Sequence, residues 1–203
     1  MTTPRAPRQM PDPEEAPSPS ARRLLYQQTL FASAELHGPQ GAVALVLIDV
    51  SIAPGSEHLG EHILSPVTSK LASLVNRRLR SVDLLVRSAR AELAVLLSFA
   101  HIDVAAAFSE RLRQPIEQAL REMTLADKVI VGMGLAANPA AAPWRPEALI
   151  ALADFRMLAA RSRARASPHR EWALAADGGS MPWDWADAGV WPTTEEITNH
   201  SGV

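Results

Sequence analysis

The segment LRSVDLLVRSARAELAVLLSF, residues 79–99, decides the fold. It contains two short apolar runs, residues 84–86 and 93–99, which are separated by residues 87–92. Runs this close allow only a hairpin connection, because a parallel crossover needs about a dozen residues or more. We therefore expect two neighbouring antiparallel strands in this segment.

Further strands and helices alternate on both sides of the hairpin. Residues 42–48 form a continuous apolar run of strand length, which is typical of a strand covered on both faces and predicts the centre of the sheet. We expect another strand at residues 129–136 and an edge strand at residues 171–175. Helical spacing predicts helices at residues 21–37, 63–79, 104–123 and 146–165. The predicted class is an α/β sandwich, in which helices pack on a mixed sheet.

The composition fits one folded domain with tails. The chain has 203 residues, of which 47% are hydrophobic and 21% charged. It has no cysteine, which excludes disulfides, thiolate metal sites and cysteine nucleophiles. The longest apolar run is far shorter than the roughly 20 residues of a membrane span, and the first residues lack the apolar core of a signal peptide. We therefore expect a cytoplasmic protein with no membrane span.

The net charge of −2 conceals an asymmetry. Residues 167–203 carry six acidic side chains against Arg170 alone, so the rest of the chain has a net charge of +3. A balance this close to neutral disfavours a general nucleic-acid-binding protein, which is usually strongly basic.

The two ends of the chain differ from its middle in composition. Residues 1–20 are rich in proline, serine and charge, and are predicted to be disordered. The acidic tail, residues 177–203, contains Trp183, Trp185 and Trp191. Two interpretations of these rings remain open: they anchor a partner protein, or they fold back and cover an exposed edge of the domain.

Several local patterns resemble, in the same order, the GGDEF domain, the fold of the bacterial diguanylate cyclases that make cyclic di-GMP from two GTP. The matching segments are residues 20–24 (SARRL, for "PNRR"), 46–50 (VLIDV, for a core strand that ends in Asp-x-Asp), 79–87 (for "lRxxDlvaR"), 94–97 (AVLL, for the next strand), 109–113 (SERLR, for "AERiR"), 129–136 (VIVGMGLA, for "vTvSiGvA") and 153–161 (ADFRMLAAR, for "ADxAmYxAK"). The resemblance covers residues 14–175. It implies a degenerate GGDEF domain over residues 21–176, with a mixed sheet like that of the class III nucleotide cyclases, flanked by helices.

The signature loop of the family is altered in this chain. Residues 89–93 read ARAEL where the family has Gly-Gly-Asp/Glu-Glu-Phe. The glycines allow positive φ in a tight turn and a close approach of the GTP phosphates, and the third residue supplies a carboxylate to the divalent metals. Arg90 fills that space and Ala91 cannot coordinate a cation. The resemblance thus implies no catalytic residues, no bound metal, no cofactor and no cyclase activity.

A few other positions of the nucleotide site have two interpretations each. Asp49 is either a polar cap at the end of a buried strand or a residual cation contact. Glu92 is either a solvated or arginine-paired hairpin residue or a remaining site acid. Arg165 is either a phosphate contact or part of a solvated helix end that the helix dipole favours. The family's guanine-reading Asn and Asp correspond to Ser56 and Ser65, so we expect base reading at that site to be lost.

The inhibitory site, which binds the product cyclic di-GMP in the family, is retained in the sequence. Arg80 and Asp83 form an RxxD motif five residues before the altered loop, and Arg111 matches the family's further arginine. Arg87 adds positive potential nearby. We expect Asp83 to accept two hydrogen bonds from a guanine edge, and a guanidinium to clamp phosphate or stack on a base. The alternative is a leftover surface ion pair.

The resemblance therefore implies a cyclic di-GMP receptor that binds its ligand at Arg80, Asp83, Arg111 and Arg87 and signals through contact with an unidentified protein partner. Two stacked ligand molecules can be gripped from both sides, so a ligand-bridged homodimer is implied as well. The alternative function is a nucleotide-independent scaffold built on a decayed domain, with the tryptophan tail as its contact.

Overall fold

The apolar run predicted at the centre of the sheet is the core of strand β1 (Val43–Ile52). The computed structural model describes residues 27, 42–137, 146–166 and 172–175. Beyond β1, the main elements are α2 (Leu64–Asn76), β2 (Leu84–Ala89), β3 (Glu92–Ser98), α3 (Ile102–Glu122), β4 (Val129–Ala137), α4 (Pro146–Ala166) and β5 (Trp172–Ala175). Two short 3-10 helices, Glu57–Leu59 and Glu61–Ile63, connect β1 to α2.

The strands form a mixed five-stranded sheet in the order β2-β3-β1-β4-β5. β1 pairs antiparallel with both β3 and β4, and β2 pairs antiparallel with β3. β5 adds to β4 in parallel, because α4 carries the chain back across the sheet before β5 begins. The predicted hairpin, the central position of β1 and the mixed α/β fold class are all confirmed.

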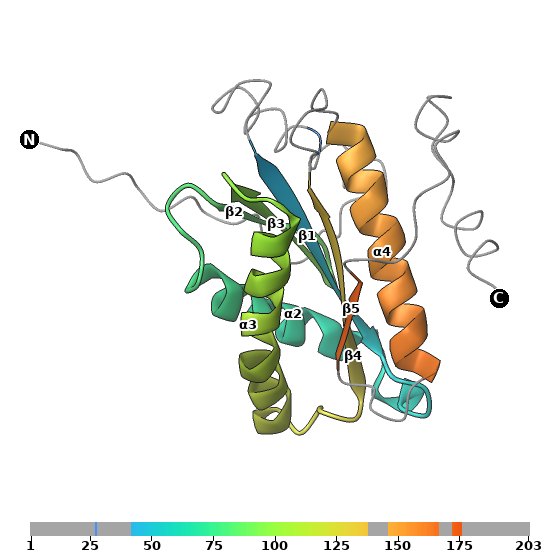
Figure 1. Cartoon of the computed structure of the whole chain (residues 1–203). Helices are drawn as coiled ribbons and strands as arrows, with labels where there is room; N and C mark the ends of the chain where they lie inside the picture. Colours follow the sequence, from blue (N-terminus) through green and yellow to red (C-terminus); the bar gives the residue numbers. More distant parts are fainter. Residues whose placement is uncertain (1–26, 28–41, 138–145, 167–171, 176–203) are drawn as a thin grey trace, which may run out of the picture.

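Helices cover both faces of this sheet (Figure 1). Alternate residues of β1 point to opposite faces. Ala44, Val46 and Ile48 pack with buried residues of α2 and α3, whereas Leu45 and Leu47 pack with buried residues of α4. Both faces of β1 are therefore buried, as a continuous apolar run predicts.

Helix α4 packs very close to β4 at Gly134. A Cβ atom added there would lie 2.0 Å from the carbonyl oxygen of Ala153 and 2.4 Å from the amide nitrogen of Met157. Only glycine permits this approach, so the position of α4 over the sheet depends on that residue.

Some element bounds differ from those predicted. The apolar run that predicts the central strand ends at residue 48, but β1 continues to Ile52 because β4 pairs with it as far as Ile52↔Val129. The hairpin turn is shorter than the predicted residues 87–92, since only Arg90 and Ala91 separate β2 from β3. The predicted disordered segment and the tryptophan tail lie outside the described residues, as does the helix predicted at residues 21–37 except for residue 27, which is helical.

No helix among the described residues is long and apolar enough to cross a membrane.

Candidate functional site

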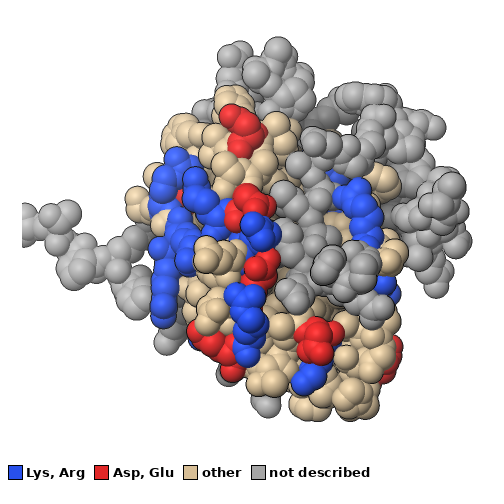
Figure 2. Space-filling model, turned by 60° about the horizontal axis from the view of Figure 1, so that its bottom comes forward, with Lys and Arg blue, Asp and Glu red and all other residues tan. Residues whose placement is uncertain are grey.

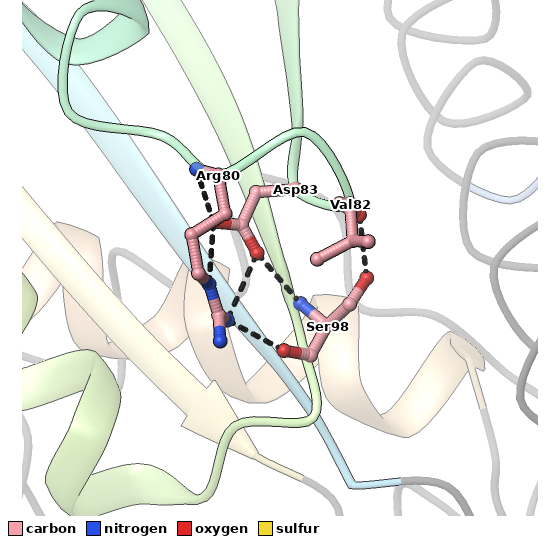
Figure 3. Close-up of polar contacts among 4 residues, drawn as sticks. All are labelled: Arg80, Val82, Asp83 and Ser98. Carbon is pink, nitrogen blue, oxygen red and sulfur yellow. Dashed lines mark hydrogen bonds and ion pairs between the residues drawn. The ribbon is translucent and has the colours of Figure 1, made fainter.

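The RxxD motif lies in the loop between α2 and β2, next to the end of β3 (Figure 3). Asp83 accepts hydrogen bonds on both carboxylate oxygens. Oδ2 accepts from the backbone N–H of Arg80 at 2.9 Å and from its Nε at 3.1 Å. Oδ1 accepts from Arg80 Nη2 at 3.1 Å and from the backbone N–H of Ser98 at 3.1 Å. Asp83 thus closes the loop on itself and ties it to β3.

Arg80 is held in one orientation by these contacts. Its Nη2 also donates to the backbone carbonyl of Ser98 at 2.6 Å, and the hydroxyl of Ser98 donates to the carbonyl of Val82 at 2.8 Å. The paired side chains differ in exposure: 53% of the Arg80 side chain is accessible and only 3% of Asp83. Nη1 of Arg80 donates to no described residue. The loop therefore presents a fixed, half-exposed guanidinium edge, with its counter-ion buried behind it.

The hydrogen bonds of Asp83 conflict with its expected role in reading a guanine edge. Both of its oxygens are occupied by the chain, so reading a guanine edge would require Arg80 and the Ser98 amide to release them. In the conformation observed, Asp83 positions Arg80.

Arg111 lies on the exposed side of α3 and makes no hydrogen bond or ion pair with another described residue. A helix rises about 1.5 Å per residue, so Arg111 lies about 13 Å further along α3 than Ile102, where the helix begins. Its neighbour Arg113 is neutralised by Glu110 at 2.6 Å and Glu117 at 3.3 Å. These ion pairs raise the pKa of Arg113. Arg80 is thus a half-exposed cation in the loop between α2 and β2, and Arg111 is a separate, exposed cation on α3.

The charged side chains do not form one continuous basic face. Figure 2 shows Lys and Arg side chains gathered along the left edge of the face in view, with Asp and Glu side chains among those nearer its centre. Positive potential is therefore local on this face, which suits a small anion better than a long polyanion.

Arg87, predicted to lie near the motif, is not brought to it. It lies toward the far end of β2, where its guanidinium donates to Ser69 Oγ at 3.0 Å, Ser65 Oγ at 3.0 Å and the carbonyl of Arg90 at 2.7 Å. Burial lowers the pKa of Arg87, and the positive charge of Arg90 lowers it further. Arg87 is therefore a structural link between α2 and the hairpin turn.

The altered signature loop forms a tight turn without glycine. Among the described residues, the only non-glycine residues with positive φ are Phe99 and Thr124, so neither Arg90 nor Ala91 needs the left-handed region. An irregularity between Arg87 and Ala89 shifts the strand register, and the backbone N–H of Val50 donates to the carbonyl of Ala91 at 2.8 Å. This turn therefore needs no positive φ, and a bulge changes how the strands enter it.

The carboxylates near the loop are engaged by the chain itself. Asp49 and Glu92 are register partners on β1 and β3, so their side chains point to the face that α4 covers. Asp49 forms an ion pair with Arg161 of α4 at 3.5 Å. Glu92 is only 2% exposed and accepts from the hydroxyl of Ser88 at 2.8 Å, so it is buried rather than solvated. No three His, Cys, Asp or Glu side chains of the described ranges lie close enough together to hold a metal ion.

Other predicted residues are placed without a resolved role. Ser56 is buried beside the first 3-10 helix, and Ser65 accepts from Arg87. Arg165 is exposed at the end of α4, while the side chains of Trp183, Trp185 and Trp191 lie outside the described residues.

Sequence reasoning missed two contacts that shape these sites. Ser98 joins the RxxD loop through both its backbone and its hydroxyl, and Arg161 neutralises Asp49. No local pattern identifies Ser98, because its role follows from strand register. Arg161 carries a weak signal, since it comes four residues after the buried Met157 and so lies on the sheet-facing side of α4.

The sheet order, the hairpin and the helices on both faces define the class of fold, which is that of the GGDEF domains of diguanylate cyclases. The GGDEF domain of DgcB from Caulobacter crescentus, solved in complex with c-di-GMP, is similar to this chain with a TM-score of 0.58 at 14% sequence identity; the match covers 88% of this chain and 98% of that one.

Two structures from Pseudomonas aeruginosa are similar as well. The GGDEF domain of YfiN matches with a TM-score of 0.53 at 22% identity, covering 79% of this chain and 97% of that one. The diguanylate cyclase SiaD, in complex with its activator SiaC, matches with a TM-score of 0.54 at 22% identity, covering 78% of this chain and 61% of that one. No protein-family model matches the sequence, and a comparison with curated proteins finds no match. At these identities the similarity establishes the fold alone.

Proposed function

We propose that this protein is a cyclic di-GMP receptor that binds the dinucleotide through Arg80 and passes the signal to a protein partner, without diguanylate cyclase activity. The observation that carries the proposal is the orientation of Arg80. Its guanidinium is fixed by Asp83 and Ser98, yet half of the side chain faces solvent. A cation prepared in this way loses little side-chain entropy when an anion binds.

The ligand fits this site chemically. Cyclic di-GMP carries two phosphates and two guanines, and a guanidinium can donate to phosphate oxygens or to the acceptor edge of guanine. Arg111 supplies a second, exposed cation on α3. Because the ligand presents each group twice, two protein copies can share bound ligand, which would yield a ligand-bridged homodimer.

The proposed lack of cyclase activity is supported by the residues at the other end of the hairpin. Phosphoryl transfer by a cyclase needs divalent cations held by carboxylates beside the triphosphate. Ala91 offers no carboxylate, Asp49 is paired with Arg161, and Glu92 is buried against Ser88. These contacts within the chain support a structural role for the two carboxylates.

Isothermal titration of the full chain with cyclic di-GMP tests the receptor role. We expect saturable binding by wild type and a loss of at least about tenfold in affinity for Arg80→Ala, since charge-assisted hydrogen bonds are worth about 1.5–3 kcal/mol. Arg121→Ala is the matched control, because Arg121 is an exposed arginine at the far end of α3. No heat for wild type at high ligand concentration, or equal affinity for Arg80→Ala, would contradict the proposal.

Two further measurements complete the test. Light scattering during the titration should show the mass doubling if ligand bridges two copies. Incubation with GTP and magnesium should give no cyclic di-GMP, and detectable product would overturn the claim that the protein is not a cyclase.

A further inference from the structure

The exposed large apolar side chains of the described residues gather at one corner of the molecule. They are Val82 at 49% exposure, Phe99 at 60%, Ile102 at 36% and Val104 at 40%. Val82 belongs to the RxxD loop, and the other three lie where β3 passes into α3. The hydrogen bond from Ser98 Oγ to the Val82 carbonyl joins these two segments. Exposed apolar groups that cluster in this way usually mark a binding surface.

Phe99 is held there against its backbone preference. Its φ is 54°, in the left-handed region that L-residues with large side chains rarely adopt. The flanking residues enforce this conformation: Ser98 still pairs with Val43 in the sheet, and the backbone N–H of Ala100 donates to the carbonyl of Ala42 at 3.1 Å. Glycine would adopt the same φ without cost. Residues strained in this way are found mostly at active and ligand-binding sites, and the side chain of Phe99 is largely exposed.

Phe99 directly follows the residue that orients Arg80. The Ser98 carbonyl accepts from Arg80 Nη2, so the aromatic ring and the guanidinium are anchored by consecutive residues. A nucleotide presents the complementary pair of groups, a phosphate for the cation and a flat heterocycle for the ring. Stacking of a base on an aromatic side chain stabilises binding whatever the base.

We propose that Phe99 is a stacking residue of the ligand site, which packs its exposed ring against a purine base of the dinucleotide whose phosphate Arg80 binds. The inference rests on the proposed receptor function and adds to it a specific residue and an interaction. It also gives the strained backbone a role, because the residue with this φ carries an exposed ring and directly follows Ser98, which orients Arg80.

Titration of the full chain with cyclic di-GMP separates the contribution of the ring from that of the fold. Phe99→Gly should bind about tenfold to a hundredfold more weakly than wild type, yet its Tm should be no lower, because glycine is relaxed at this φ. Phe99→Tyr keeps the aromatic face and should bind within about threefold of wild type. Thr124→Gly is the matched control, since Thr124 is the other non-glycine residue of the described ranges with a positive φ and follows the opposite end of α3, so its affinity should not change. Val104→Ala shortens another exposed side chain of the same corner and should weaken binding much less than Phe99→Gly.

The alternative outcomes are distinguishable. If wild type binds and Arg80→Ala weakens binding while Phe99→Gly binds normally, stacking is refuted and the receptor function stands. If Phe99→Gly and Val104→Ala weaken binding equally, the corner acts as a general apolar surface, and the stacking role of Phe99 is refuted. If wild type does not bind cyclic di-GMP, both proposals fail.

Discussion

The two ends of the β2–β3 hairpin have opposite characters. At the open end, defined by Arg80, Asp83, Ser98 and Phe99, a cation and an aromatic ring are fixed in place and still reach solvent. At the closed end, defined by residues 87–92, Arg87 and Glu92 make their hydrogen bonds within the chain. One pair of strands therefore carries an accessible cation and aromatic ring at one end and an internally hydrogen-bonded junction at the other.

This difference shows that the same residue types do not indicate the same role. Arg80 and Arg87 lie seven residues apart on the same side of the turn. Arg80 leaves one guanidinium edge directed to solvent, whereas the guanidinium of Arg87 donates to five oxygens of α2 and of the hairpin. Stability and ligand affinity should therefore respond to mutation at different ends of the hairpin.

The largest effect on stability should come from Arg87→Ala. The substitution removes the link from the turn to Ser65 and Ser69 and leaves the Arg90 carbonyl without its donor. We expect the free energy of unfolding to fall by about 3 kcal/mol. Urea denaturation measures this change. Titration of the variant under folding conditions should give the wild-type affinity for cyclic di-GMP, and a lower affinity would break the distinction between the two ends.

Asp83→Ala should have the next largest effect, and it should change both properties. The backbone N–H groups of Arg80 and Ser98 lose their acceptor, which should lower the free energy of unfolding by about 2 kcal/mol. Arg80 also loses its orientation, so affinity should fall as well. Arg80→Ala provides the contrast: it removes the charge that compensates the buried carboxylate but leaves both backbone N–H groups bonded to it, so the free energy of unfolding should fall by less than in Asp83→Ala. Equal destabilisation by both variants would show that Asp83 does not act as the anchor.

Rebuilding the family signature in the loop should not create an enzyme. The triple variant Ala89→Gly, Arg90→Gly, Ala91→Asp restores the turn residues and one carboxylate, but Asp49 remains paired with Arg161. We expect no cyclic di-GMP from GTP and magnesium, together with a loss of about 1–2 kcal/mol in stability from the two added glycines. Production of cyclic di-GMP by this variant would show that only the turn residues, and not the pairing of Asp49 with Arg161, prevent catalysis.

The smallest effect should come from Thr124→Gly, at a site remote from both ends. Thr124 follows the end of α3 with a φ of 59°, and its β-branched side chain is unfavourable there. Glycine should raise the free energy of unfolding by about 1 kcal/mol. Thermal denaturation measures this change, and its size gives the stabilisation to expect when glycine replaces Phe99. A lower Tm would indicate that the threonine makes contacts that outweigh its strain.

The sequence predicts the fold better than it predicts the sites. The run at residues 42–48 identifies β1 because burial of both strand faces leaves a continuous apolar signature. The spacing of the two runs after Asp83 likewise predicts the hairpin. The contacts of Arg87 and Arg161 leave no such signature, because they depend on which helix lies over which strand end. Of the proposed site, Arg80 and Asp83 could be paired from their spacing, whereas Ser98 and Phe99 join them only through the register of β3.

The turn at Arg90 and Ala91 has a consequence for how such a chain can change. Because neither residue has a positive φ, any L-amino acid other than proline can occupy these positions without a conformational penalty. The hairpin is held by the bulge, by the Val50–Ala91 hydrogen bond and by Arg87, none of which depends on the side chains at the turn. Its shape is thus independent of its sequence signature. The residues of the turn can therefore be substituted while the opposite end of the hairpin, whose geometry depends on Asp83 and Ser98, keeps its structure.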